Sequence, residues 1–153
     1  MATAFPGASV IDRRDNPSHG YRAVHIIAEI SGKPVEIQVW TALQHLWAEV
    51  SEKSSDVLDP TIKYGGGPES WRNFLTKSSA SVAACEKAEA AHEVFEKAFA
   101  KLLEHDPPDH EVQELRGKLE ESRAERVRCR NANADLLNEM ISWLDERARE
   151  QKQ

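Results

Sequence analysis

The sequence predicts an α+β protein in which a small antiparallel β element precedes a long helical hairpin. Residues 21–40 contain two short runs rich in β-branched and aromatic residues, separated by the turn-forming sequence SGKP at residues 31–34. Residues 68–153 instead repeat apolar side chains at helical spacing. We therefore divide the chain into two parts: residues 1–67 form the β element with its helix, and residues 68–153 form the hairpin.

The β element is predicted to contain three strands. A short strand, Ser9–Ile11, follows a loose apolar start, and residues 12–20 form a loop dense in charge and turn formers. A second strand begins at Tyr21, and we expect it to be covered on both sides because both of its faces are partly apolar. The third strand, Val35–Trp40, pairs with it in the antiparallel direction across the turn at residues 31–34.

A helix that packs on this sheet is predicted after the third strand. Thr41 is placed to cap its start, and the helix should fade near residues 56–60, before the glycine-rich loop of residues 63–67. Its apolar face recurs at helical spacing: Leu43, Leu46, Trp47 and Val50.

Two helices of about 35 to 40 residues, each about 50–60 Å long, are predicted in the second part. Pro68 is well placed as the first residue of one helix, and Asp109 as the cap of the other, after the break at Pro107-Pro108. The first helix carries an a/d stripe: Trp71, Leu75, Ser78, Val82, Cys85, His92, Phe95, Phe99 and Leu102. The second helix continues it: Val112, Leu115, Leu119, Cys129, Leu136, Met140 and Trp143. These stripes exceed what the small β element can cover, so we expect a homodimer through the long helices.

Composition limits the classes of function and partner. The net charge of −6 comes from interspersed acidic and basic residues, whereas nucleic-acid-binding proteins normally present a basic face, so nucleic acid is not an expected partner. No stretch approaches the roughly 18 apolar residues of a membrane span, and the start lacks signal-peptide features. A cytoplasmic protein without a membrane partner is predicted. Cys85 and Cys129 lack metal-ligand spacing, and we expect both to be buried, reduced thiols.

Two features of the β element suit chemistry. Glu36 and Gln38 are two residues apart on a strand, so both side chains point to the same face. Such a pair is compatible with a metal ligand or general base beside a positioning amide, and a solvent-facing edge strand is the alternative. Tyr21 follows Gly20 at a strand start, where an aromatic ring can stack on a planar ligand or simply pack.

The blocks HGYRAVH (residues 19–25) and VEIQV (residues 35–39) resemble the acceptor-nucleotide half of the RelA/SpoT family, the guanosine tetra- and pentaphosphate synthetases or GTP pyrophosphokinases. The resemblance covers residues 9 to roughly 70. Members of this family act in the stringent response and transfer pyrophosphate from ATP to the ribose 3′-hydroxyl of GDP or GTP. The resemblance implies a nucleotidyltransferase-like half-domain whose partner is a guanine nucleotide.

Residue by residue, the resemblance implies that Tyr21 stacks on guanine and that Glu36 ligates Mg²⁺ and activates the 3′-hydroxyl, supported by Gln38. A ribose hydroxyl is a poor nucleophile, which explains the need for a carboxylate and a metal. The nucleotide-binding set is completed by other members of the first block: Gly20, Arg22 and His25. A buried, hydrogen-bonded histidine is the alternative for His25. The helix that follows also matches the family, and a structural role is expected for its polar residues: Gln44, His45, Glu49 and Lys53.

Two departures from the family pattern bear on activity. The family's ATP-binding half, with a second metal carboxylate and a basic cluster, corresponds to sequence upstream of residue 9, so we expect pyrophosphate transfer to be absent from this chain alone. The family pattern EIQ-(Ile/Val)-Arg-Thr is EIQVWT here, with Trp40 in place of arginine.

Three alternatives remain for the function of the chain. A split enzyme would receive its missing half in trans. A non-enzymatic dimerisation or regulatory protein derived from the synthetase fold would use the helical hairpin. In an enzyme completed across a subunit interface, the second long helix would supply the basic residues: Arg123, Arg126, Arg128 and Arg130.

Overall fold

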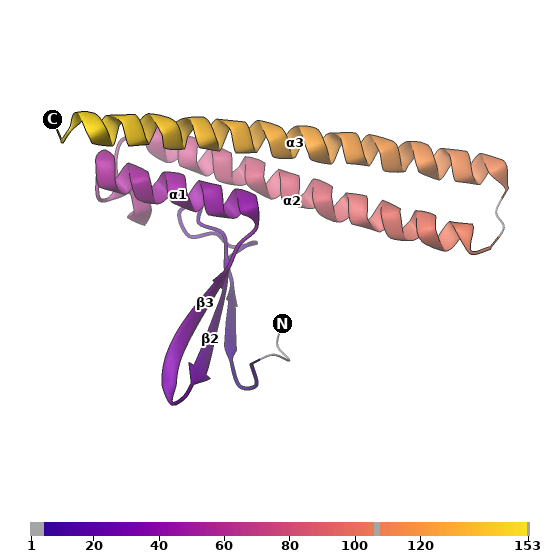
Figure 1. Cartoon of the computed structure of the whole chain (residues 1–153), viewed down its shortest axis with the longest axis horizontal. Coiled ribbons are helices and arrows are strands. Elements are labelled where there is room, and N and C mark those ends of the chain that lie inside the picture. The colour runs from indigo at the N-terminus through magenta and orange to yellow at the C-terminus, as the bar shows by residue number, and fades with distance from the viewer. Residues whose placement is uncertain (1–4, 106–107, 153) are drawn as a thin grey trace.

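The computed structural model describes residues 5–105 and 108–152, in which a three-stranded sheet projects from a group of three helices (Figure 1). The elements follow the chain in this order: β1 (Ser9–Asp12), β2 (Val24–Ile30), β3 (Lys33–Val39), α1 (Ala42–Val57), the 3-10 helix η1 (Ile62–Tyr64), α2 (Glu69–Leu103) and α3 (Asp109–Glu150). The α+β class with a helical hairpin, predicted from the sequence, is confirmed.

The sheet is antiparallel with the order β1-β2-β3, so β2 is its central strand. The turn between β2 and β3 needs only two residues, Ser31 and Gly32, whose φ angles of 53° and 73° suit the mirror-image turns of hairpins. Lys33 and Pro34, expected in the turn, therefore join β3. Pro34 is tolerated because β3 is an edge strand.

Helix α1 packs against the long helices, and the prediction that it covers the sheet is wrong. Its apolar residues Trp47 and Val50 belong to one core with Leu75 of α2 and Leu137 of α3. In Figure 1 the sheet extends away from all three helices and meets α1 only at its base. The long helices offer α1 a larger apolar surface than a three-stranded sheet does, so burial of apolar area favours this arrangement. One core therefore joins helices from both parts of the chain.

The start of α1 is fixed by a capping box, which confirms Thr41 as the cap. The backbone N–H of Gln44 donates to the Thr41 hydroxyl at 3.2 Å, and the backbone N–H of Thr41 donates to the Gln44 side-chain oxygen at 3.0 Å. Two backbone donors that the helix leaves free are thereby satisfied. The cap also fixes where the chain turns from β3 into α1.

The starts of the long helices differ by one residue from the prediction: α2 begins one residue later, and α3 begins one residue earlier, at Asp109, which was expected to be its cap. Pro68 is the N-cap of α2, which begins at Glu69, and Pro108 is the N-cap of α3, which begins at Asp109. A proline at the cap has φ close to its fixed value and has no N–H that would need a partner. Pro107, the other half of the predicted break, lies outside the described residues.

The hairpin of α2 and α3 contains 35 and 42 residues, respectively. Buried residues of α2 follow the predicted stripe: Leu75, Ser78, Val82, Cys85 and His92. On α3 the stripe is displaced by one residue, since Leu137 and Leu144 are fully buried whereas Leu136 and Trp143 are 40% and 41% exposed. This part of α3 packs against α1 and α2 together, so its buried face is set by two neighbours.

Cys85 and Cys129 form a disulfide between α2 and α3, and the prediction of two reduced thiols is wrong. Both residues lie on the predicted seam of the hairpin. The antiparallel pairing of the helices brings their Cα atoms to 5.6 Å, within the usual range for a disulfide. The spacing within each helix carries no information about this register.

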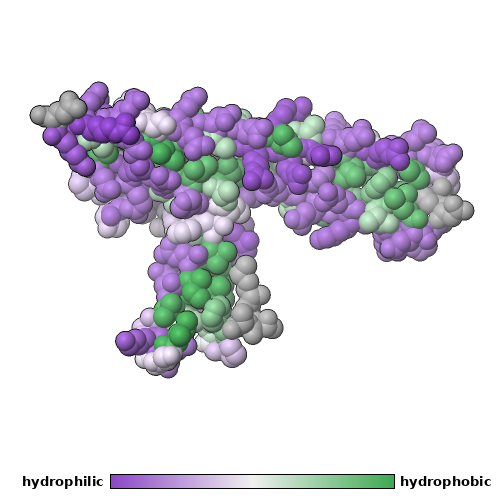
Figure 2. Space-filling model, in the orientation of Figure 1, coloured by the Kyte–Doolittle hydropathy of each residue, from purple (hydrophilic) through white to green (hydrophobic). Residues whose placement is uncertain are grey.

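The surface differs between the helices and the sheet. Figure 2 shows mainly hydrophilic residues over the helices and apolar residues gathered along the projecting sheet. In the described part of the chain, no helix combines the length and apolarity needed to cross a membrane.

Candidate functional site

A tight turn before β2 positions Tyr21. The backbone N–H of Tyr21 donates to the Ser18 carbonyl at 2.9 Å, and that of Ser18 donates to the Tyr21 carbonyl at 3.2 Å. Between them, His19 and Gly20 both have positive φ angles, 53° and 92°. Two successive positive φ angles define a mirror-image turn, which glycine adopts without strain. The turn places Tyr21, half-buried, at the base of the sheet.

Gly20 is required by packing as well as by the turn. A Cβ atom at this position would lie 2.7 Å from the Trp47 ring, and the Gly20 carbonyl accepts a hydrogen bond from Ser79 of α2 at 2.6 Å. Trp47 is only 3% exposed and donates its indole N–H to the Leu75 carbonyl at 2.9 Å. Gly20 thus lets the turn approach the interface of α1 and α2.

The sheet brings His25, Glu36 and Gln38 together on one face. His25 lies opposite Gln38 in the pairing of β2 with β3. The Nδ1 atom of His25 lies 2.5 Å from Oε1 of Glu36, and the Gln38 amide donates to Oε2 of Glu36 at 3.2 Å. These hydrogen bonds, that of His25 first, hold the pKa of the Glu36 carboxyl below its ordinary value of 4.5. The other ring nitrogen of His25, Nε2, is buried and has no hydrogen-bond partner among the described residues.

Tyr21 and Trp40 form an aromatic pair next to this group. The indole N–H of Trp40 donates to the Tyr21 phenol oxygen at 3.2 Å. Burial raises the pKa of the Tyr21 phenol above 10.0, and the bond from Trp40 opposes part of that rise. The rings of Tyr21 and His25 meet edge to face at 5.7 Å. The phenol therefore stays protonated at neutral pH and can still donate a hydrogen bond.

These side chains line a cavity of about 660 Å³ at the foot of the sheet. Its volume lies within the range of roughly 300–1,000 Å³ common for small-molecule sites. The sheet and the loop before it contribute one wall: Arg13, Ser18, His19, Tyr21, His25, Gln38 and Trp40. Helix α1 and η1 contribute the other wall: His45, Trp47, Ala48, Glu49, Ser51, Glu52, Lys63 and Tyr64.

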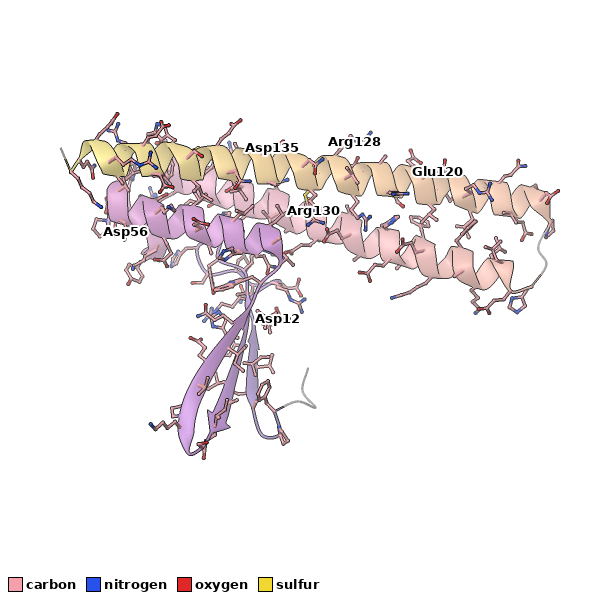
Figure 3. The ribbon with its side chains drawn as sticks, viewed as in Figure 1. Asp12, Asp56, Glu120, Arg128, Arg130 and Asp135 are labelled. Carbon is pink, nitrogen blue, oxygen red and sulfur yellow. A yellow bond between two sulfur atoms is a disulfide. The ribbon has the colours of Figure 1, made fainter. Side chains whose placement is uncertain are left out.

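The cavity combines aromatic rings with charges of both signs. Arg13 and Lys63 are the cations among the lining residues, and the Lys63 ammonium lies 3.9 Å from the Glu52 carboxylate. Asp12, whose place near the foot of the sheet is labelled in Figure 3, forms an ion pair with Arg14, which lowers the Asp12 pKa to about 2. Both members of that pair are outside the lining. Flat rings beside exposed cations suit a ligand with an aromatic base and phosphate groups.

Some of the site residues predicted from the sequence line the cavity, and others lie outside it. Tyr21, His25 and Gln38 line it, and Glu36 is connected to it through its bonds to His25 and Gln38. Gly20 and Arg22 are outside its lining. The Arg22 guanidinium is instead paired with Glu86 of α2 at 2.9 Å and is 13% exposed. The nucleotide contacts predicted for Gly20 and Arg22 stay predictions.

Sequence reasoning gave the polar residues of α1 a structural role, yet His45 and Glu49 line the cavity. They are four residues apart and therefore share one face of the helix. That spacing, next to the EIQ strand, was a usable signal. Lys63 and Tyr64 could not be found this way, because η1 reaches the cavity through a loop of irregular backbone.

The described residues do not form a metal site by themselves. Within residues 5–105 and 108–152, no group of three or more His, Cys, Asp or Glu side chains is placed so that it could hold a metal ion. Glu36 offers one carboxylate, and both of its oxygens already accept hydrogen bonds. Mg²⁺ at phosphate sites often takes one or two carboxylates and completes its shell with phosphates and water. The Mg²⁺ ligation predicted for Glu36 stays a prediction.

The arginines of α3 lie apart from the cavity within one chain. Figure 3 shows Arg128 and Arg130 on α3, while the sheet projects beyond α1 on the other side of the helices. Arg128 is engaged with Glu125 of its own helix at 2.7 Å. Basic residues from this helix would reach a cavity only in a second copy of the chain.

Part of the chain is similar to curated mycobacterial proteins. No family model matches the chain, and no solved structure matches it significantly. The uncharacterized protein Rv1366 of Mycobacterium tuberculosis and the uncharacterized protein Mb1401 of Mycobacterium bovis are each 43% identical to it over 61 residues. These residues are 40% of this chain and 22% of each relative, so the chain spans less than a quarter of the length of the curated relatives it matches. The names of these relatives state no activity.

Proposed function

We propose that this chain is the acceptor-nucleotide half of a RelA/SpoT-like guanosine tetra- and pentaphosphate synthetase and binds GDP or GTP in the cavity. One observation carries the proposal. Tyr21, His25 and Gln38, which were selected from two separate sequence blocks, line a single cavity of suitable size, and Glu36 is one hydrogen bond away. The role of each residue follows from its chemistry.

The base is proposed to stack on Tyr21. The ring is half-buried and held by Trp40, so little of its conformational freedom is lost when a ligand binds. Arg13 and Lys63 are the lining residues that would attract the phosphates. The whole chain carries a net charge of −6, so this attraction is local.

Glu36 is proposed as the group that accepts the proton of the ribose 3′-hydroxyl. Its lowered pKa keeps it ionised at neutral pH, but it also makes the carboxylate a weak base. A bound Mg²⁺ ion would supply the missing activation by making the hydroxyl more acidic. A triphosphate donor also requires several cations. We therefore propose that the chain alone binds GDP or GTP without transferring pyrophosphate. A cytoplasmic location is part of this proposal.

The test is calorimetric titration of GDP and GTP, each with Mg²⁺, into the wild type, Tyr21→Ala and Tyr21→Phe. Loss of a stacking ring is expected to weaken binding roughly ten- to hundredfold. Tyr21→Phe is the matched control, because it keeps the ring and removes only the hydroxyl. ADP serves as the control ligand, since it differs from GDP only in the base.

Two results would contradict the proposal. An absence of binding at millimolar GDP and GTP would reject the nucleotide site. Equal affinity for ADP and GDP would reject a guanine site. A third measurement tests the claim about transfer, because synthesis of guanosine tetraphosphate from ATP and GDP by the purified chain would overturn it.

A second candidate function is self-association through α3. Leu136 and Trp143 are exposed and seven residues apart, so they lie on one face of the helix. A dimer through this face is expected to dissociate in Leu136→Lys/Trp143→Lys, whereas Asn138→Lys, at an exposed position on another face of the same helix, is the control. Sedimentation velocity checks the outcome, and a monomeric wild type at micromolar concentration would reject this candidate.

A further inference from the structure

We propose that Glu86 on α2 is a positioning residue that holds the aromatic wall of the cavity in place from behind. The identity of the ligand rests on the proposed function, whereas the hydrogen bonds of Glu86 are independent of it. Glu86 lies outside the lining of the cavity and outside the sequence blocks that suggested the site. Its carboxylate is the point where the sheet, α1 and the hairpin meet.

The Glu86 carboxylate accepts hydrogen bonds from two segments of the chain. Oε2 accepts from the Arg22 guanidinium at 2.9 Å. Oε1 accepts from the Gln44 amide at 2.5 Å and from the Thr41 hydroxyl at 3.2 Å. The side chains of Arg22 and Glu86 are only 13% and 18% exposed. Charged hydrogen bonds that are shielded from water are stronger than exposed ones, so this group constrains both segments.

The same two segments carry the aromatic pair. Tyr21 precedes Arg22 and Trp40 precedes Thr41, and both aromatic residues line the cavity. Successive side chains of extended backbone point in opposite directions, and Thr41 has extended backbone angles. One carboxylate therefore holds both segments on the side away from the ligand. On the side of the ligand, the hydrogen bond from Trp40 to Tyr21 connects the same two segments a second time.

Glu86 itself is held in a rigid part of α2. The preceding residue, Cys85, is bonded to Cys129 of α3 and is 2% exposed. Val82, one turn earlier, is 1% exposed in the core. The hairpin thus presents Glu86 at a fixed place, and the aromatic wall is positioned relative to the hairpin.

A reciprocal exchange of two residues tests this role. Glu86→Gln turns one acceptor atom into a donor, which then meets a donor on Gln44 or Arg22. Gln44→Glu alone places a second carboxylate against Glu86. The double variant Glu86→Gln/Gln44→Glu restores a donor opposite an acceptor, keeps one negative charge, and places glutamate at the third helical position, where a capping box accepts it. Glu93→Gln, on the exposed face of α2, is the matched control.

Two measurements are made on all variants. The first is the indole N–H signal of Trp40 in the proton–nitrogen correlation spectrum, which Trp40→Phe identifies among the four tryptophans. The second is the affinity for GDP with Mg²⁺. Each single variant is expected to shift the Trp40 signal and to weaken GDP binding about tenfold, since each disrupts a hydrogen bond to a charged group. The double variant is expected to restore both readouts, and Glu93→Gln to change neither.

A merely structural role for Glu86 would lower the melting temperature and leave the Trp40 signal in place. That result, or a double variant no better than the two single ones, would overturn the inference. If Glu86→Gln does not fold, Gln44→Glu and the double variant still complete the comparison. If the wild type does not bind GDP, the proposed function fails while the Trp40 signal still tests Glu86.

Discussion

Trp40 donates a hydrogen bond from its indole nitrogen to the phenol oxygen of Tyr21 over 3.2 Å, and so joins the end of β3 to the turn before β2. The two residues are 19 positions apart in the sequence. Trp40 occupies the position where the RelA/SpoT family, which this sequence resembles, has arginine. A neutral indole that donates a hydrogen bond to Tyr21 thus stands where that family has a cation.

The Trp40–Tyr21 bond has a titration signature. In a Tyr64→Phe background, the Tyr21 phenol is expected to titrate above 10.0, because burial disfavours its charged form. Trp40→Phe should raise that pKa further, since it removes a donor that stabilises the phenolate. The ultraviolet absorbance of the phenolate measures both values. An unchanged or lowered pKa in Trp40→Phe would show that the bond is absent in solution.

Glu36 is expected to titrate below 4.5, with His25 as the main cause and Gln38 as the lesser one. His25→Phe should therefore raise the Glu36 pKa more than Gln38→Met does, as measured by carbon NMR of the carboxyl group. Because the folded-state pKa is lowered, the pair stabilises the fold above the unfolded-state value. That contribution is lost as the pH falls through the lower, folded-state pKa. Urea unfolding of the wild type and His25→Phe from about pH 2 to pH 6 checks the sign: the stability that the wild type has relative to His25→Phe should decrease toward the acid end.

Gly20→Ala is expected to destabilise the protein by about 2–5 kcal/mol, the sum of a backbone cost and a steric cost. The new Cβ would lie 2.7 Å from the Trp47 ring, at a residue whose φ is +92°. Gly32→Ala is the matched control, because Gly32 also has a positive φ, +73°, but no atom within 4 Å of the added carbon. It should cost about 1–2 kcal/mol. Equal losses in urea unfolding would mean that the turn does not pack on Trp47.

The disulfide between Cys85 and Cys129 is expected to stabilise the hairpin by about 4 kcal/mol, on the chain-entropy account for a loop of this length. The two residues are 44 positions apart. A reducing agent should lower the free energy of unfolding of the wild type by that amount and should not affect Cys85→Ser/Cys129→Ser. Alkylation and mass spectrometry before reduction provide a direct check, since two reactive thiols in the purified protein would contradict the bond. Disulfides are uncommon in the cytosol outside redox-active proteins, so this measurement also bears on the proposed location.

Much of the local structure could be predicted from the sequence. The three strands, the cap at Thr41 and the buried face of α2 follow from spacing and residue type within a few positions. Of the candidate site, Tyr21, His25 and Gln38 were found because two motifs carry them, and Glu36 lies with them. Arg22 belonged to the same motif but is paired with Glu86, 64 positions away. No local pattern reports such a partner.

By itself the sequence determined the order and type of the elements, the end of the β element and the small group of residues worth testing. Only the tertiary structure decided that α1 packs on the hairpin and not on the sheet, and that the buried face of α3 is displaced by one residue from the predicted stripe. It also decided that Cys85 and Cys129 form a disulfide. The physical reason is one of range. Turn angles, caps and periodicity act between residues a few positions apart, whereas the register of two long helices is chosen by the total apolar area that all elements bury together.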